Sequence, residues 1–232
     1  MNKPRRLRLL PFLFAACAGL PLYGQQYEIG PYFTFDRMSR APLGTVRQTG
    51  GADSDTRWGD GNGIGVRVTL NTKGYYGHEV GFERSHVNLR SNVDEFLIAS
   101  DGTITLGNAV DRKEKVRQSR LSYNFLMYMM PAGEWWRPYI TVGVTSVSTS
   151  PPRFYEWNSN GSRNFGANWG GGIKLFPKKN FLVRLDARQI IAGRPYTLVY
   201  PTAGDGTGGK VSPGNTKQLE ISAGVSFAFG KH

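Results

Sequence analysis

Apolar and polar residues alternate with period 2 along most of the chain. The last segment shows this best, with one face formed by Leu219, Ile221, Ala223, Val225, Phe227 and Phe229, and the other by Gln218, Glu220, Ser222, Gly224, Ser226 and Ala228. Such alternation predicts a β-strand with one apolar face. The pattern predicts eight strands, over residues 27–37, 61–70, 75–89, 116–129, 137–147, 165–176, 181–189 and 217–229.

The connections between these strands are of two kinds, which alternate along the chain. Those after strands two, four and six are short, over residues 71–74, 130–136 and 177–180. Those after strands one, three, five and seven are long and polar, over residues 38–60, 90–115, 148–164 and 190–216. Short turns on one side and long loops on the other are typical of outer-membrane barrels, with the short turns in the periplasm.

Membrane insertion is compatible with this pattern only if the strands close into a ring. Mean hydropathy is −0.38, and the chain contains no run of about 18 apolar residues that could form a membrane helix. A closed barrel is the other structure that satisfies every backbone group in lipid. We therefore predict an all-β fold, an eight-stranded antiparallel up-and-down transmembrane β-barrel over residues 25–232. A soluble barrel with its apolar face around a ligand is the alternative.

The N-terminus is typical of a secretory signal peptide, residues 1–24. Four cations, Lys3, Arg5, Arg6 and Arg8, precede an apolar stretch over residues 9–22, and Gly24 then offers a cleavage point. Lipoprotein processing at Cys17 is the second interpretation, because Ala15 and Ala16 precede this cysteine. Cleavage after Gly24 would leave the mature chain without cysteine, and hence without a disulfide or a Cys-based metal site.

The polar face of the strands carries charges of both signs. The acids are Glu28, Asp36, Glu79, Glu83, Asp186 and Glu220, and the bases are Arg67, Arg120, Lys174, Arg184 and Arg188. This near balance predicts pairing inside a narrow lumen, because unpaired buried charges are costly. Glycines on the same face, such as Gly65, Gly81 and Gly224, would make room for the long side chains. We predict a lumen charge network of Glu28, Arg67, Glu79, Glu83, Arg120, Lys174, Arg184, Asp186, Arg188 and Glu220.

Aromatic residues gather where the strands meet the short turns. They are Tyr27, Tyr75, Tyr76, Trp135, Trp136, Phe176, Phe181 and Phe229. Amphipathic rings favour the lipid–water interface, which predicts a periplasmic aromatic girdle. Trp58 belongs either to a looser outer girdle or to a loop.

The net charge is basic but does not indicate nucleic-acid binding. Removing the four signal-peptide cations from 29 Lys and Arg leaves 25 against 17 acids, a net charge of +8. No nucleic-acid motif accompanies this charge. An exported barrel meets anionic headgroups instead, so we expect outer-membrane lipid and lipopolysaccharide as partners.

The mature region resembles the small outer-membrane β-barrel family that includes OmpA-like and OmpX-like barrels. The segments 137–144 (RPYITVGV), 168–174 (NWGGGIK) and 225–229 (VSFAF) carry the resemblance most specifically. It implies insertion into the bacterial outer membrane by the barrel-assembly machinery, which recognises a last strand ending on an aromatic. Here three residues follow Phe229, which departs from that pattern.

Enzymatic chemistry has little support in the sequence. Some eight-stranded barrels modify lipid A, and a hydrolase of this kind needs a nucleophile, a histidine base and an orienting acid. His86, next to Ser85 near the outer rim, is the best candidate, but no deacylase-like arrangement surrounds it. Asp53, Asp55 and Asp60 do not have the spacing of a calcium loop. We therefore predict no catalytic residues, no metal site and no cofactor.

The expected role is structural, adhesive or loop-mediated binding, without a wide pore. An extracellular ligand of the long loops is therefore expected as a further partner. The two rival functions are an outer-membrane lipid-modifying enzyme and a secreted soluble barrel that binds an apolar ligand.

Overall fold

The structure, a computed structural model, describes residues 26–47, 54–72, 74–98, 100, 104–150, 157–158, 163–198, 208–211 and 215–230. The predicted signal peptide, including Cys17, lies outside these residues. The strands are β1 (Gln26–Met38), β2 (Pro42–Arg47), β3 (Ser54–Thr72), β4 (Tyr76–Ile98), β5 (Ile104–Tyr128), β6 (Trp136–Thr149), β7 (Trp157–Asn158), β8 (Arg163–Lys178), β9 (Phe181–Ala192), β10 (Thr197–Leu198), β11 (Gly208–Val211) and β12 (Thr216–Gly230). None of the described residues forms a helix that is long and apolar enough to cross a membrane.

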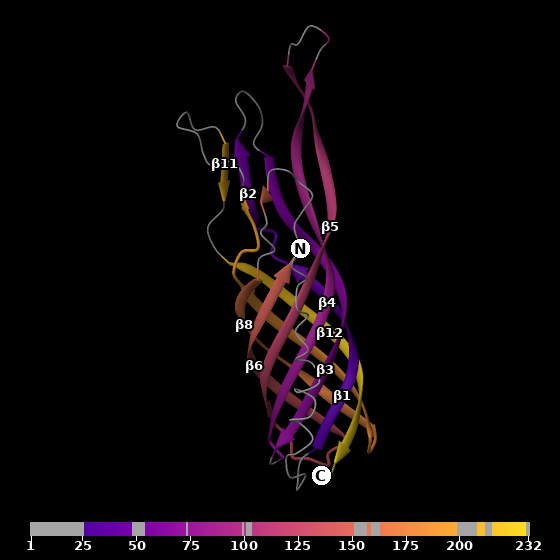
Figure 1. The fold of residues 1–232 in the computed structure, drawn as a ribbon. Coiled ribbons are helices and arrows are strands. Elements are labelled where there is room, and N and C mark those ends of the chain that lie inside the picture. Colours follow the sequence, from indigo (N-terminus) through magenta and orange to yellow (C-terminus); the bar gives the residue numbers. More distant parts are fainter. Residues whose placement is uncertain are drawn as a thin grey trace, which may run out of the picture.

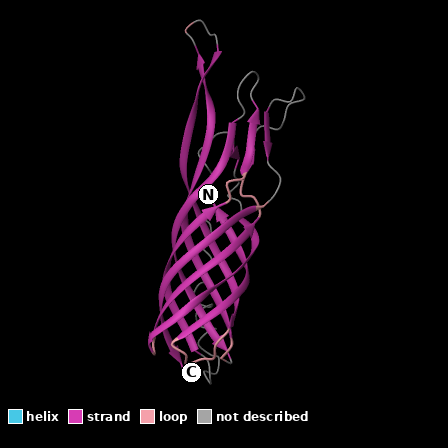
Figure 2. Ribbon diagram, turned by 180° about the vertical axis from the view of Figure 1, so that it is seen from behind, coloured by secondary structure: helices cyan, strands magenta, loops and turns pink. Residues whose placement is uncertain are grey.

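Eight long strands form a closed antiparallel ring. The order is β1-β12-β9-β8-β6-β5-β4-β3, and β3 pairs back to β1. Figure 1 shows the tilted strands wrapping around one axis, and Figure 2 shows the same barrel from behind. All eight predicted strands are therefore confirmed, and the up-and-down barrel with them.

The outer wall of the ring is apolar. Side chains on this face, such as Ile64, Val142 and Phe165, are 58–78% exposed, whereas the alternate positions point inward and are buried. A soluble barrel would hide its apolar face, so this arrangement contradicts the soluble-barrel alternative.

Glycines shape the short turns at one end of the ring. Gly74 has a φ of 76° between β3 and β4, and Gly133 has a φ of 99° between β5 and β6. Residues with a Cβ rarely adopt this left-handed conformation, which explains why glycine stands at both turns.

The four long connections are not simple loops, and their predicted boundaries were wrong. β2 lies within 38–60, β7 within 148–164, and β10 and β11 within 190–216. The segment 90–115 is mostly a continuation of β4 and β5, which remain paired up to Ile98 and Ile104. Outside the lipid, neither face of a hairpin has to be apolar, so period-2 hydrophobicity ends before the strands do.

Strand β3 changes partner as it leaves the ring. Residues 61–71 of β3 pair with β1, whereas residues 54–57 pair with β2. A bulge between Trp58 and Gly61 separates the two parts. A bulge bends a strand and increases its local twist. It thereby directs the upper part of β3 away from the end of β1, and β2 and β11 add to the sheet there.

Candidate functional site

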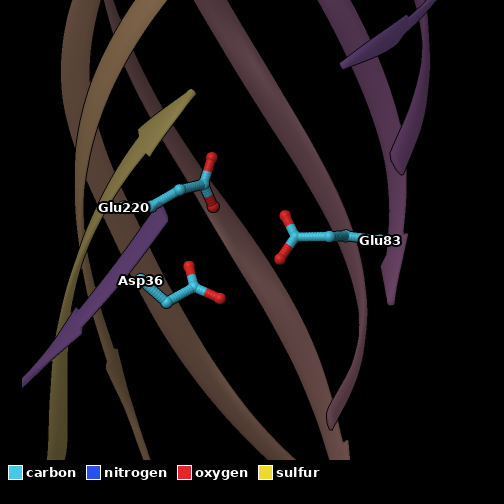
Figure 3. A group of neighbouring side chains, drawn as sticks. All are labelled: Asp36, Glu83 and Glu220. Carbon is cyan, nitrogen blue, oxygen red and sulfur yellow. The ribbon is translucent and has the colours of Figure 1, made fainter. Parts of the chain in front are cut away.

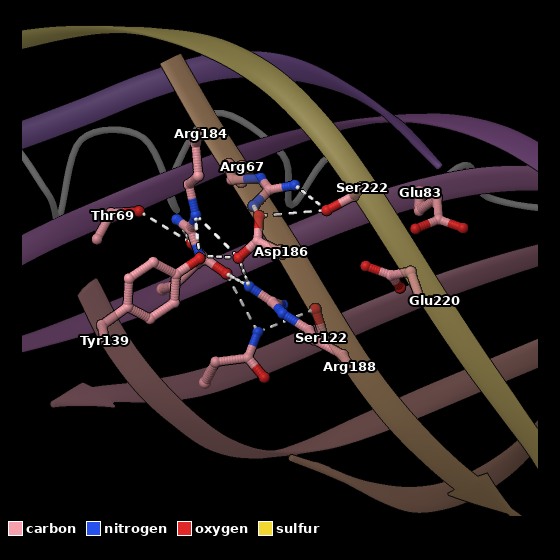
Figure 4. Close-up of polar contacts among 12 residues, drawn as sticks. Arg67, Thr69, Glu83, Ser122, Tyr139, Arg184, Asp186, Arg188, Glu220 and Ser222 are labelled. Atoms are coloured by element: carbon pink, nitrogen blue, oxygen red, sulfur yellow. Dashed lines mark hydrogen bonds and ion pairs between the residues drawn. The ribbon is translucent and has the colours of Figure 1, made fainter. Parts of the chain in front are cut away.

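The ten residues predicted for the lumen network all lie inside the ring. Each has at most 6% of its surface exposed. They come from seven of the eight barrel strands. Some pairs join opposite walls, such as Arg67 of β3 with Asp186 of β9 (Figure 4), and others join neighbouring strands, such as Glu83 of β4 with Arg120 of β5. The lumen is thus filled by charged side chains, as expected for a ring of eight strands.

Glu79 is the centre of the half of the network near the short turns. Arg184 Nη1 donates to its Oε2, and Arg188 Nη2 lies 2.7 Å from its Oε1. Thr69 Oγ1 donates a further hydrogen bond of 3.1 Å to Oε2. These partners come from β9 and β3, so Glu79 connects opposite walls of the barrel.

Asp186 is the second carboxylate bound by several arginines. Arg67 Nη1 donates to Oδ2 at 2.6 Å, and Arg184 Nη2 donates to Oδ1 at 2.9 Å. Ser222 Oγ adds a hydrogen bond of 3.2 Å to Oδ2. Arg184 therefore bridges Glu79 and Asp186, and Figure 4 shows Asp186 between Arg184, Arg67 and Ser222.

Lys174 lies opposite Arg184 on the neighbouring strand β8 and is fully buried. Its Nζ donates to Glu28 Oε2 at 2.5 Å and to the Tyr128 hydroxyl at 2.7 Å. Asn71 Nδ2 donates to the other oxygen of Glu28 at 2.6 Å. The buried ammonium group thus has a charged partner and a neutral one, which is the condition under which a charge is tolerated in a low-dielectric interior.

Arg120 holds together the other half of the network, nearer the long connections. Asp36, Glu83 and Glu220 point toward one another there (Figure 3), and each can bring an oxygen within 4.8 Å of the others. Arg120 Nη2 donates to Glu83 Oε2 at 2.6 Å and to Glu220 Oε2, and lies 3.7 Å from Asp36 Oδ1. The guanidinium therefore occupies the place between the carboxylates that a cation would take.

The charges in the lumen balance as a whole but not at each end. We call Glu28, Arg67, Glu79, Arg137, Lys174, Arg184, Asp186 and Arg188 the short-turn cluster, and Asp36, Glu83, Arg120 and Glu220 the loop-end cluster. Among these described residues, five bases face three acids in the first cluster, and one base faces three acids in the second. The lumen is thus polarised along the barrel axis, with excess positive charge toward the short turns.

Arg137 and three tyrosines are parts of the lumen that the sequence prediction missed. Arg137 is 1% exposed and its guanidinium lies 3.9 Å from the centre of the Tyr128 ring. Arg67 lies 3.8 Å from the Tyr32 ring, and Arg184 lies 4.7 Å from the Tyr139 ring. Stacking on an aromatic face adds attraction for a cation. The alternation of β6 was the available signal, because it places residue 137 on the same face as Gly143.

Tyr32 fits into the lumen because glycines stand on both sides of it. A Cβ at Gly65 would lie 2.4 Å from the Tyr32 ring, and one at Gly224 would lie 2.7 Å from the Tyr32 Cβ. The ring is also covered by Arg67, so it has little room to move aside. The two glycines are therefore required by packing.

We expect Gly65→Ala to lower the free energy of unfolding by about 1–3 kcal/mol through overpacking. The matched control is Gly81→Ala, whose new Cβ would lie 3.1 Å from the Ser122 hydroxyl, which can rotate away, and 3.5 Å from the Tyr32 hydroxyl, an ordinary contact distance. Urea unfolding in detergent micelles measures both variants. Equal losses would contradict the role assigned to Tyr32.

An apolar cluster covers the loop-end cluster. Its buried members are Met38, Leu43, Trp58, Val87, Leu89, Val116 and Tyr196. The Tyr196 hydroxyl donates to the Ser150 carbonyl at 2.7 Å, and burial raises the pKa of this hydroxyl above its usual range. We call this cluster the apolar plug. Trp58, expected in an outer girdle or a loop, is instead part of it, because the bulge in β3 turns this side chain inward.

The eight aromatic residues predicted for the girdle lie at the short-turn end of the ring. Tyr27 and Phe229 are opposite each other on β1 and β12, with ring centres 6.0 Å apart. Trp135 is 66% exposed beside Trp136. This position suits rings that contact both lipid and water.

The candidate pair Ser85 and His86 does not form a dyad. Ser85 is buried in the lumen, whereas His86 is exposed on the outer wall. The other described histidine, His78, lies on the outer wall with Nδ1 at 2.8 Å from the Tyr123 hydroxyl. Of the suggested acidic residues, Asp53 lies outside the described residues, and Asp60 Oδ1 accepts a hydrogen bond from the Met38 backbone.

Comparisons with known proteins agree with the fold. Residues 12–229 match the model of the outer membrane protein beta-barrel domain. The outer membrane protein OprG from Pseudomonas aeruginosa has a similar structure, with a TM-score of 0.60 and 11% identity over 90% of this chain and 97% of that one. The outer membrane protein AlkL, solved in lipid bilayers, has a TM-score of 0.53 and 12% identity over 100% and 98% of the two chains. Among curated proteins, no sequence match is found.

Proposed function

The chain belongs to the outer membrane beta-barrel family of bacteria, and within it we propose that this protein is a sealed anchor that presents a rigid β-hairpin for binding outside the cell. The hairpin is the upper part of β4 and β5. The function is then adhesive or structural rather than transport through a wide pore.

The closed lumen supports this proposal. The two charged clusters fill the ring, and the apolar plug covers the end toward the long connections. Eight-stranded rings have an interior just wide enough for side chains, whereas porins of 16–18 strands leave an aqueous channel.

The length of the hairpin is the observation that carries the proposal. β4 has 23 residues and β5 has 25, whereas a strand needs about 9–11 residues to cross a membrane. The neighbouring strands stop pairing at Ser91 on one side and at Gln118 on the other. Beyond Ser91 the hairpin rises as a two-stranded ribbon above the ring (Figure 1).

The ribbon inherits its register from the barrel. An isolated hairpin is marginally stable in water, whereas this one continues strands that are fixed by neighbours on both sides. A binding surface held in this way loses little conformational entropy when a partner docks.

Truncation of the hairpin tests the proposal. Residues 93–110 are replaced by Asn-Gly, which joins the opposed residues Asn92 and Asp111 by a two-residue turn. We expect the barrel to fold, shown by a normal shift on a heat-modifiability gel. Adhesion of bacteria displaying the protein to a surface coated with basement-membrane extract should fall at least tenfold.

The matched control alters a turn at the opposite end of the ring. Lys179→Asn with Asn180→Gly introduces the same Asn-Gly pair between β8 and β9 and should leave adhesion unchanged. Full adhesion by a folded barrel without the hairpin would overturn the proposed function.

A further inference from the structure

The outer wall of β4 and β5 carries a row of cations above the lipid-facing band. Its exposed members, which we call the basic ladder, are Arg84, Arg90, Lys113, Lys115 and Arg117. Arg90 lies directly opposite Lys113. Like charges at opposed positions of a sheet repel, so this arrangement is destabilising unless an anion lies over it.

Few acids accompany the ladder in the described part of this wall. Asp111 pairs with Lys113 across 3.3 Å, with both side chains more than half exposed. Asp60 on β3 uses one oxygen to accept from a backbone amide. On its other side Arg90 faces Arg57 of β3, which extends the run of positive charge to a third strand.

The ladder begins where the apolar wall ends. On β4, Arg84 follows Phe82 on the same face, and its opposite residue on β3 is the highly exposed Ile64. On β5, Arg117 lies four residues before the lipid-facing Leu121. This is the level at which lipid headgroups meet a barrel, and surface cations there attract anionic lipids.

An apolar groove of about 770 Å³ lies in the wall directly beside the ladder. Phe33, Ile64, Val66, Phe82 and Val225 line it, and Arg84 forms part of its edge. Small residues make the groove, since Pro31 and Ala223 stand where large side chains occur elsewhere on the wall. The pairing of β1 with β12 is also interrupted at Pro31, which has no N–H to donate.

We propose that the groove and the basic ladder together bind one phosphorylated glycolipid of the outer leaflet. An acyl chain lies in the groove, and the phosphates lie on Arg84, Arg90 and Arg117 with the two lysines beside them. Opposed side chains of neighbouring strands are about 5 Å apart at Cβ, so two cations can reach one phosphate. Arginine adds paired hydrogen bonds to phosphate oxygens.

The charges distinguish this occupant from a second copy of the chain. A symmetric dimer through this wall would bring the same cations of both copies together. A lipid offers phosphate and acyl chains in one molecule, which matches a surface with both a positive and an apolar part. The inference needs only the inserted barrel and is independent of any adhesive role of the hairpin.

Native mass spectrometry of the protein released from nanodiscs tests the proposal. The nanodiscs contain phosphatidylcholine with a small fraction of either bisphosphorylated or dephosphorylated lipid A. We expect one bisphosphorylated molecule to stay on the wild-type barrel and the dephosphorylated one to be lost. Arg84→Gln/Arg90→Gln/Arg117→Gln should lower this retention at least tenfold.

Two matched variants separate the site from general charge and general shape. Arg40→Gln/Arg163→Gln/Lys217→Gln removes three other exposed cations near the same rim and should retain the lipid. Ala223→Trp fills the groove and should release it, whereas Ala187→Trp, on the outer wall of β9 away from the groove, should not.

Three results would overturn the proposal. The first is equal retention of the bisphosphorylated lipid by the two charge variants. The second is equal retention of the bisphosphorylated and the dephosphorylated lipid by the wild type. The third is equal displacement of the lipid by Ala223→Trp and Ala187→Trp. Inorganic phosphate is the probe for a soluble anion. If millimolar phosphate protects the ladder arginines from modification as well as the lipid does, the site binds anions and not a lipid.

Discussion

Glu79→Gln is expected to lower the free energy of unfolding by about 3–5 kcal/mol, the usual cost of breaking a buried ion pair from one side. Glu79 is 1% exposed and is the carboxylate on which Arg184 and Arg188 converge. Its loss leaves Asp186 and Glu28 as the remaining acids for five buried cations in the short-turn cluster. The neutral amide keeps the shape of the side chain, so the effect reports charge rather than packing.

Urea unfolding in phospholipid vesicles, followed by tryptophan fluorescence, measures this effect. Glu134→Gln is the control, because it replaces the same carboxylate by an amide in an exposed turn between β5 and β6. The control should change stability by less than about 0.5 kcal/mol. Similar values for the two variants would show that the lumen network contributes no more than surface charge.

Arg120→Leu is expected to have a comparable or larger effect in the loop-end cluster. The substitution leaves Asp36, Glu83 and Glu220 buried with no described cation in contact with them. Three carboxylates in a low-dielectric interior repel one another in addition to losing their partner, so we expect a loss of at least about 3–5 kcal/mol.

Neutralising the partners should restore part of this stability. Arg120→Leu combined with Glu83→Gln and Glu220→Gln removes the repulsion while keeping the volume of both side chains. We expect the triple variant to be more stable than Arg120→Leu in the same urea assay, and to insert where the single variant fails. A triple variant that is less stable would mean that Arg120 acts by packing instead.

The strands were predictable because lipid imposes a strict rule on one face of each. Outward residues between the interfaces are apolar with few exceptions such as His78, as Leu121, Tyr123 and Met127 illustrate on β5. The rule ends at the headgroups, and for this reason the prediction stopped at residues 89 and 116 while the hairpin continues to Ile98 and Ile104.

The pairing inside the lumen could not be read from alternation. Period 2 assigns a side chain to the inside, but its partners depend on the tilt and stagger of all eight strands. Glu79 on β4 pairs with Arg184 on β9, although β4 and β9 are not adjacent strands of the sheet. The near balance of charge along the sequence likewise concealed the separation of positive and negative excess along the barrel axis.

The seam between β1 and β12 determines when the ring can be completed. Tyr27 pairs with Phe229, so closure joins two segments that lie nearly a whole chain apart. Contacts of such high sequence separation form slowly, because the loop entropy is lost before the contact is gained. Until β12 arrives, β1 and β9 each present an unpaired edge, which lipid does not tolerate. We therefore expect a seven-stranded intermediate to be unstable within the membrane until β12 pairs with both edges.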